Sequence, residues 1–342
     1  MNHDHGICNS EKRRTTLDVS DRSVADLVSD MGRMGFQGGQ LGQSLKAWEN
    51  MLDEEITIFL GLAGAMVPAG LGEMISYLIS HRMVDCLVST GANLFHDLCE
   101  GLGIVHYRGS ACADDAYLKE CKIDRIYDVF VSEVELHKAD NYISDFVKKL
   151  DSSKTYSSRE FMSMLGSTLP PTTILGAASR AGVPIFVPAL GDSSYGIGMV
   201  MAYRDGNRVL IDQIKDVDEI TQMVEKSSQT GVVYIGGGVP KNFIQQTEVI
   251  AELIGNYSGG HNYAIQYTTD TPHFGGLSGC TFEEAVSWGK VSKEAKKVQV
   301  FADATITVPM VVHALQTQES RRKSFPVLDW TESGLNLRYQ KR

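Results

Sequence analysis

Short apolar runs recur along this chain, and each is followed by a glycine-containing turn and a stretch with helical periodicity. Five such runs occupy residues 56–62, 84–90, 182–190, 231–238 and 298–304. Each run is nearly continuous in apolar residues, which is typical of strands covered on both faces. Because the strands alternate with helices, the sequence predicts an α/β fold with a doubly wound, mostly parallel sheet.

Two segments depart from this alternation. Residues 1–55 are predicted to be a polar tail followed by a helical segment that glycines interrupt. Residues from about 107 to 169 are more polar and richer in helical pattern, so we expect an insertion that covers one edge of the sheet. Because no Pro-rich linker or repeat divides the rest, we predict a single α/β catalytic domain over residues 56–342.

The composition excludes several classes of protein. The 42 acidic and 32 basic side chains give a formal net charge of −10, which argues against nucleic-acid binding. No apolar run reaches the roughly 18 residues of a membrane span, and the amino terminus has no secretory signal. The six cysteines form no CxxC pair, so we expect a cytoplasmic protein with reduced thiols. His3 and His5 could bind a metal ion, but chain termini are usually frayed, and we predict no metal site.

The turns after the apolar runs are the candidate ligand site, because parallel sheets bind ligands beyond the carboxyl ends of their strands. The glycine triplet at 236–238 lies between a strand and a helix, where backbone amides can approach phosphate. A purely structural tight turn explains this triplet equally well. Small-residue turns at 63–70 and 89–93 favour an extended dinucleotide. Asp303 could accept ribose hydroxyls, cap the following helix, or do both.

The stretch EEAVSWGK, residues 283–290, places Lys290 two positions after Trp288. An amine beside an apolar ring loses hydration, its pKa falls, and its neutral form is a nucleophile toward imine carbon. An exposed lysine after a buried tryptophan is the simpler interpretation, and the stretch alone favours it. Glu284 could pair with a ligand ammonium or complete a capping box with Thr281.

Together these motifs resemble one family. EEAVSWGK, the following VFADA, GGGVPKN, PALGDSS, FLGLAGA, VDCLVSTGAN and GFQGGQLGQ occur in the order found in deoxyhypusine synthase and its bacterial, deoxyhypusine synthase-like homologues. The resemblance covers about residues 30–315. Its most specific element is AVSWGK, which carries the family's catalytic lysine. The resemblance implies a Rossmann-like NAD-binding fold of the deoxyhypusine synthase type.

The resemblance also implies an activity and an assembly. NAD oxidises a polyamine to an imine, Lys290 attacks the imine carbon, an acceptor amine displaces the lysine, and the stored hydride reduces the product. Such enzymes act on small amines such as putrescine or spermidine. They are homotetramers with paired sites at subunit interfaces.

By motif position, the resemblance assigns roles to individual residues. Lys290 is the expected catalytic residue, and Glu284, Trp288, His96 and Asn242 are expected to bind the substrate. The residues expected to contact NAD are Thr90, Gly91, Asp192, Gly237, Gly238, Thr269, Asp303 and Ala304.

Six positions depart from the pattern of the eukaryotic enzymes, and two of them, Gly64 and Ala65, replace a serine–asparagine pair in the first turn. Ile197 and Leu277 stand where aspartates are expected, Asn242 where a histidine is expected, and His96 where an acidic residue is expected. Because such positions bind the ammonium groups of the substrate, the lysine chemistry is retained while polyamine recognition is changed. We expect an NAD-dependent aminobutyl or aminoalkyl transferase, for instance one that forms homospermidine. The alternatives are a deoxyhypusine synthase proper that modifies a protein lysine, and a non-catalytic NAD-binding subunit.

Overall fold

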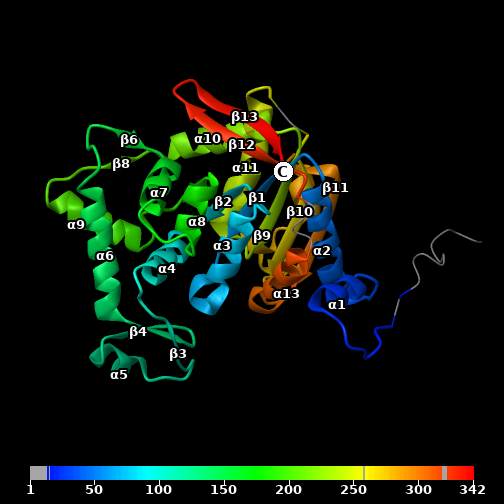
Figure 1. Ribbon diagram of the computed structural model, residues 1–342, viewed down its shortest axis with the longest axis horizontal. Helices are drawn as coiled ribbons and strands as arrows, with labels where there is room; N and C mark the ends of the chain where they lie inside the picture. Colours follow the sequence, from blue (N-terminus) through cyan, green and yellow to red (C-terminus); the bar gives the residue numbers. More distant parts are fainter. Residues whose placement is uncertain (1–13, 15, 257–258, 318–321) are drawn as a thin grey trace, which may run out of the picture.

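A six-stranded parallel sheet forms the centre of the molecule. The structure is a computed structural model that describes residues 14, 16–256, 259–317 and 322–342; His3, His5 and most of the predicted polar tail lie outside these residues. The strand order is β11–β10–β9–β1–β2–β7, and every neighbouring pair is parallel (Figure 1). The predicted α/β class and the doubly wound parallel sheet are confirmed.

The strand order determines where a ligand can bind. The strands are β1 (Thr57–Leu62), β2 (Cys86–Ser89), β7 (Ile185–Phe186), β9 (Thr230–Ile235), β10 (His261–Thr268) and β11 (Val291–Phe301). The chain builds β1, β2 and β7 outward in one direction, then returns to place β9 beside β1 and continues through β10 to β11. The order therefore reverses between β1 and β9, and a doubly wound sheet binds ligands at such a reversal.

Side chains of each strand alternate between two cores, one on each face of the sheet. On β1, Ile58 and Leu60 join one core and Phe59 joins the other. The helices of the first face are α2 (Phe36–Asp53), α3 (Gly72–Ser80), α4 (Gly91–Gly101), α8 (Ile174–Ala181) and α13 (Ala304–Gln316). The second face is covered by α10 (Gln213–Lys226), α11 (Gly238–Leu253) and α12 (Phe282–Ser287).

The helical segment before residue 56 packs directly against the sheet. Ser23 caps α1 (Val24–Met31) by accepting the amide of Asp26, and α1 packs against α2, which in turn contacts β10 and β11. A Cβ on Gly42 would lie 2.1 Å from the backbone nitrogen of Gly32, so glycine is required where the two helices meet. The buried Trp48 donates from Nε1 to the Met83 carbonyl oxygen at 3.2 Å.

The segment from residue 107 to 169 contains strands that the sequence pattern did not indicate. Its elements are β3 (Tyr107–Arg108), α5 (Asp115–Glu120), β4 (Ile123–Ile126), β5 (Val129–Ser132), α6 (Glu133–Val147), β6 (Thr155–Tyr156) and α7 (Ser158–Gly166). Strands β3, β5 and β4 form a small antiparallel sheet. Helix α6 packs against α9 (Ser194–Arg204), and α7 packs against the edge strand β7. Figure 1 shows this segment on the side of the sheet away from α1 and α2.

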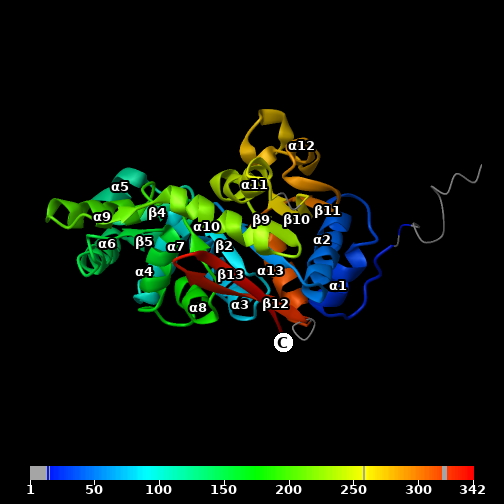
Figure 2. The same cartoon turned by 90° about the horizontal axis from the view of Figure 1, so that it is seen from above.

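A carboxyl-terminal hairpin completes the fold. Strand β12 (Ser324–Thr331) pairs antiparallel with β13 (Gly334–Lys341), and β13 packs on α10 (Figure 2). Strand β8 (Leu210–Ile211) pairs with β6. Among the residues that the structure describes, no helix is long and apolar enough to cross a membrane.

Candidate active site

The first two strand-end turns are tied together by a buried asparagine. The amide oxygen of Asn93 accepts hydrogen bonds from the backbone nitrogens of Met66 and Val67 at 3.0 and 3.1 Å. Its Nδ2 donates to the Gly64 carbonyl oxygen at 2.7 Å and to Thr90 Oγ1 at 3.1 Å. The turn after β1, which leads into η2 (Val67–Leu71), is thereby fixed against the start of α4. The sequence pattern marked this turn as rich in small residues but did not indicate Asn93.

The loop after β7 lies against the same helix start. Gly91 is the first residue of α4, and a Cβ there would lie 2.3 Å from Ser193 Oγ. Ser193 caps α9, and the exposed Asp192 precedes it. The structure therefore brings Thr90, Gly91 and Asp192 close together, as expected of residues that share one ligand.

The glycine triplet forms the turn between β9 and α11. A Cβ on Gly237 would lie 2.5 Å from the Cα of Ser278, so this turn is packed against the loop after β10. The Gly238 amide donates to Ser278 Oγ at 3.1 Å. This amide already has a protein acceptor and is not free to bind phosphate. Thr269 lies exposed directly after β10.

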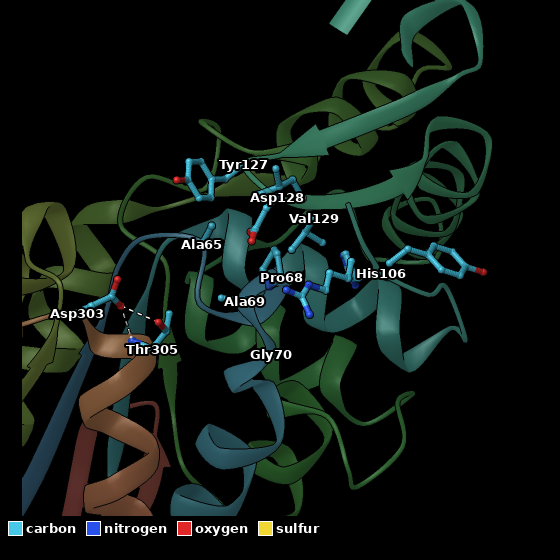
Figure 3. Close-up of a pocket in the computed structure, with 13 residues that line it drawn as sticks. Ala65, Pro68, Ala69, Gly70, His106, Tyr127, Asp128, Val129, Asp303 and Thr305 are labelled. Carbon is cyan, nitrogen blue, oxygen red and sulfur yellow. Dashed lines mark hydrogen bonds between the residues drawn. The ribbon is translucent and has the colours of Figure 1, made fainter. Parts of the chain in front are cut away.

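A large pocket opens at the amino-terminal end of α13 (Figure 3). Its volume is about 620 Å³, and we call it the Asp303 pocket. Its lining residues come from the turn after β1 with η2, from β3 to β5, and from the start of α13. They are Ala65, Pro68, Ala69, Gly70, His106, Tyr107, Arg108, Ile126, Tyr127, Asp128, Val129, Asp303 and Thr305.

Asp303 both caps α13 and faces this pocket. Its Oδ1 accepts hydrogen bonds from the backbone nitrogen and Oγ1 of Thr305 at 2.7 and 2.8 Å. The second carboxylate oxygen is turned away from these donors (Figure 3). One carboxylate can therefore cap the helix and still accept hydroxyl groups. Ala304, the first residue of α13, is buried beside it.

Lys290 lies between α12 and β11. Its backbone nitrogen donates to the Ala285 carbonyl oxygen at 3.1 Å, and its carbonyl oxygen accepts from the His261 amide at 3.2 Å. Its Nζ is 3.4 Å from Asn242 Oδ1 and 5.3 Å from the centroid of the Trp288 ring. The backbone is therefore fixed on both sides, while the amine reaches the first turns of α11.

A second pocket of about 200 Å³ surrounds this amine, and we call it the Lys290 pocket. Its lining residues are Pro272, Gly275, Gly276, Leu277, Gly279, Cys280, Glu284, Ala285, Trp288 and Lys290. Trp288 is 62% exposed, so the indole is an open wall of the pocket. The buried tryptophan of the simpler interpretation is not found in this chain, and Lys290 itself is half-buried.

Glu284 contributes a carboxylate to the Lys290 pocket. Thr281 Oγ1 accepts the Glu284 amide at 3.1 Å, so the threonine caps α12 as expected. Burial raises the pKa of the Cys280 thiol; the Lys241 ammonium opposes this effect, and Glu284 adds to it. Glu284 therefore lies near Cys280 in the pocket lining, where its carboxylate can pair with a bound cation.

Lys241 is a functional candidate that the sequence pattern did not indicate. It is 1% exposed, and its Nζ donates to the Cys280 carbonyl oxygen at 2.6 Å and to Gln266 Oε1 at 2.9 Å. Burial lowers the pKa of Lys241 to about 8, and the charge of Lys290 contributes in the same direction. A lysine in the first turn of a helix opposes the helix dipole, and this unfavourable position could have indicated a special role.

His96 is not part of the Lys290 pocket in this chain. Its Nδ1 is 2.9 Å from His106 Nε2, and His106 Nδ1 is 3.4 Å from Glu100 Oε1. Burial lowers the pKa of His96 to about 4, and His106 adds to this effect. Since His106 lines the Asp303 pocket, His96 is linked to that pocket.

The two pockets share no lining residue. Val67 and Val308, next to the Asp303 pocket, belong to the core of one face, whereas Phe282 and Ala285, next to Lys290, belong to the other. A single chain thus presents the two pockets on opposite faces of the sheet. Of the positions that depart from the eukaryotic pattern, Leu277 and Asn242 lie at the Lys290 pocket, while Ile197 is exposed on α9.

Comparisons with known proteins decide the family. A model of the deoxyhypusine synthase family matches residues 26–315. The chain belongs to the deoxyhypusine synthase family. The "Probable deoxyhypusine synthase 2" of Methanosarcina mazei is 58% identical over 94% of this chain and 96% of its own length. The same organism's "Probable deoxyhypusine synthase 1" is 39% identical over 89% of this chain and 94% of its own length.

A solved structure agrees with this assignment at the level of the fold. A putative deoxyhypusine synthase from Entamoeba histolytica superposes with a TM-score of 0.63, covering 87% of this chain and 96% of its own, at 19% identity. Within the deoxyhypusine synthase family, both Methanosarcina relatives are archaeal proteins. The resemblance to bacterial members in particular therefore stays a prediction.

Proposed function

We propose that this protein transfers an aminobutyl or related aminoalkyl group between small amines, with Lys290 as the covalent carrier and NAD as the cofactor. The observation that carries the proposal is the Lys290 pocket, where a half-buried lysine lies beside an indole, a carboxylate and an amide oxygen. Membership of an aminobutyl transferase family supports it.

The residues around Lys290 suit attack on an imine carbon. The amine must lose a proton before it can react. Asn242 Oδ1, 3.4 Å from Nζ, accepts a hydrogen bond that orients the amine. Trp288 offers a flat face to the substrate, and a ring in this position attracts an ammonium group by about 0.5–2 kcal/mol. Glu284 can pair with an ammonium at the far end of the same amine.

Group transfer then proceeds on the lysine. Once the donor has been oxidised to an imine, Lys290 Nζ attacks the imine carbon, and the donor nitrogen leaves as a free amine, or as ammonia from a diamine. The acceptor amine then attacks the carbon of this lysine imine, the bond between that carbon and Nζ breaks, and the lysine is released. NAD, when bound, would accept a hydride from the donor and return it to the product, so that no net redox change results. The side chains of the Lys290 pocket hold the ammonium ends and keep the reacting carbon beside Nζ.

The residues of the Asp303 pocket fit a dinucleotide. The second oxygen of Asp303 is available to ribose hydroxyls, and the pocket volume is about 620 Å³. Thr90 begins α4 at the end of β2, one strand away from β1, and the amino-terminal ends of helices favour phosphate groups. These groups lie around the reversal of strand order at β1 and β9.

We further propose that two copies of the chain complete each active site within a cytoplasmic homotetramer. The separation of the two pockets on opposite faces supports this assembly, because one chain alone presents its lysine away from its own Asp303 pocket. Phe274, Leu277 and Trp288 are 84%, 51% and 62% exposed around Lys290. Such clustered apolar side chains suit burial against a partner, which would also exclude water from the amine.

Borohydride trapping tests the proposed function. The protein is incubated with NAD and a panel of diamines and polyamines, reduced, and digested for mass spectrometry. We expect an aminoalkyl adduct at Lys290 that is lost in Lys290→Ala and retained in Lys293→Ala, because Lys293 is an exposed lysine on β11, three residues after Lys290. No adduct with any amine would contradict the proposal.

The same incubation distinguishes the possible acceptors. A small-amine enzyme forms a new amine, such as homospermidine, with no protein acceptor present. A deoxyhypusine synthase proper forms the Lys290 adduct but releases product only when a protein acceptor is added. A non-catalytic NAD-binding subunit would bind NAD without forming the adduct.

A further inference from the structure

The turn between β4 and β5 carries an exposed aromatic side chain in a rare backbone conformation. Tyr127 has φ of +58°, a left-handed value that non-glycine residues seldom adopt, and it is 75% exposed. Both features are unfavourable for stability. Backbone strain of this kind concentrates at functional sites, so the pair of features indicates a functional role for Tyr127. Tyr127 and the next residue, Asp128, line the Asp303 pocket.

The surrounding sheet holds this turn in place. Ile126 pairs with Val129 across the hairpin, and Arg125 Nη1 donates to the Tyr127 carbonyl oxygen at 2.9 Å. The guanidinium of Arg125 is itself held by both carboxylate oxygens of Asp115, at 2.5 and 2.7 Å. The strained turn is therefore fixed by specific side-chain contacts.

Strand β3 pairs beside this turn and places the charged side chain of Arg108 at the same pocket. The Gly109 amide donates to the Asp128 carbonyl oxygen at 2.7 Å, and a Cβ on Gly109 would lie 2.4 Å from the ring of Phe130. Arg108 directly precedes this close contact and lines the pocket. Among the described lining residues, Arg108 is the one with a permanent positive charge.

The two sides of the pocket offer different chemistry to a ligand. Figure 3 shows Tyr127 and Asp303 on facing sides of the pocket, with the small residues Ala65 and Ala69 between them and the helices behind. A flat aromatic ring can stack on a nucleobase, a carboxylate can accept ribose hydroxyls, and a guanidinium can bind phosphate. This combination suits the adenosine diphosphate portion of a dinucleotide.

We propose that Tyr127 stacks on the nucleobase of a nucleotide bound in the Asp303 pocket and that Arg108 contacts the phosphates of the same ligand. The inference rests on the dinucleotide site of the proposed function. It adds a wall that the small β3–β5 sheet contributes to the nucleobase end of that site.

Calorimetric binding with the full chain tests this inference. The ligands are NAD, ADP-ribose and nicotinamide mononucleotide, and the variants are Tyr127→Ala and Tyr127→Phe. Loss of base stacking in Tyr127→Ala should raise the dissociation constants of NAD and ADP-ribose by the same factor, about tenfold. Phenylalanine should retain nearly all of the affinity. Nicotinamide mononucleotide, which lacks the adenosine half, should bind the wild type and both variants equally.

Matched variants control for indirect effects. Tyr117→Ala removes an exposed tyrosine from α5 in the same segment, outside the pocket lining, and should bind every ligand like the wild type. Arg108→Gln should weaken ADP-ribose binding and leave adenosine binding unchanged. Tyr127→Gly relieves the left-handed backbone, so its melting temperature should be unchanged or higher while its NAD affinity falls as in the alanine variant.

The outcomes separate this inference from the proposed function. If the wild type binds NAD and ADP-ribose and Tyr127→Ala binds them equally well, the inference is overturned while the cofactor assignment stands. If Tyr127→Gly loses stability together with affinity, the tyrosine is structural and the inference is likewise overturned. If the wild type binds neither NAD nor ADP-ribose, the cofactor assignment fails and the inference fails with it.

Discussion

The buried Lys241 should give this protein a characteristic dependence of stability on pH. Burial lowers the pKa of Lys241 from 10.5 to about 8. Below pH 8 the folded and unfolded chains both carry the proton, and the cost of burying the ammonium is fully present. Between pH 8 and 10.5 the folded chain has released the proton while the unfolded chain keeps it. The free energy of unfolding therefore rises with pH across this window.

The expected magnitude follows from the two pKa values. The difference between 10.5 and about 8 corresponds to about 3 kcal/mol in total, of which about 2 kcal/mol appears between pH 7.5 and 9.5. Lys241→Met removes the titrating group and retains an unbranched side chain. The variant also loses the hydrogen bonds to Gln266 and to the Cys280 carbonyl oxygen. That loss changes its stability at every pH but not the slope.

Guanidinium unfolding at pH 7.5 and 9.5, at one fixed protein concentration, measures the effect. Between the two pH values, the free energy of unfolding should rise by about 2 kcal/mol more in the wild type than in Lys241→Met. Lys293→Met, at an exposed position, should behave like the wild type. The same pH dependence in all three proteins would refute the conclusion that burial lowers the pKa of Lys241 in the folded chain.

Three further predictions concern the turns and the buried charges. Asn93→Ala should lower the free energy of unfolding by about 2–4 kcal/mol in denaturant titration, because it leaves the part-buried amide of Met66 and the buried amide of Val67 without their acceptor. Asp85→Asn should cost about 3–5 kcal/mol in the same assay, since the fully buried Arg322 loses its anionic partner. As pH falls from 6.5 to 4, His96 binds a proton in the unfolded chain but not in the folded chain. The free energy of unfolding of the wild type should therefore fall, by about 3 kcal/mol at most. The His96→Gln variant should lose less over the same pH range.

The strands of the sheet were predictable where both faces are apolar. The run at 56–62 contains β1, and the run at 231–238 covers β9 except for its first residue, Thr230; both strands are buried along their whole length. Strand β10 was missed because polar residues interrupt it. One of these, Gln266, is fully buried, and its Nε2 donates to the carbonyl oxygens of Gly236 and Ser278. Only the folded chain provides these acceptors, so the local sequence could not identify the strand.

The candidate site was predictable to the extent that short motifs carry it. Lys290, Trp288 and Glu284 lie within one stretch, and the structure places Asn242 beside them. The burial of Lys241 could not be predicted from the sequence, because it depends on groups from β10 and from the loop before α12. The three strands beside the Asp303 pocket are likewise only two to four residues long and too short to show periodicity.

The way the loop before α12 is attached has a consequence for how this enzyme family can diversify. Lys241 and Gln266 hold the loop through the carbonyl oxygens of Cys280 and Ser278, which are backbone atoms that any residue supplies. Side chains such as Leu277 can therefore be replaced during evolution without loosening the segment that carries them. Under the proposed function, new amine preferences would arise there by single substitutions while Lys290 keeps its position.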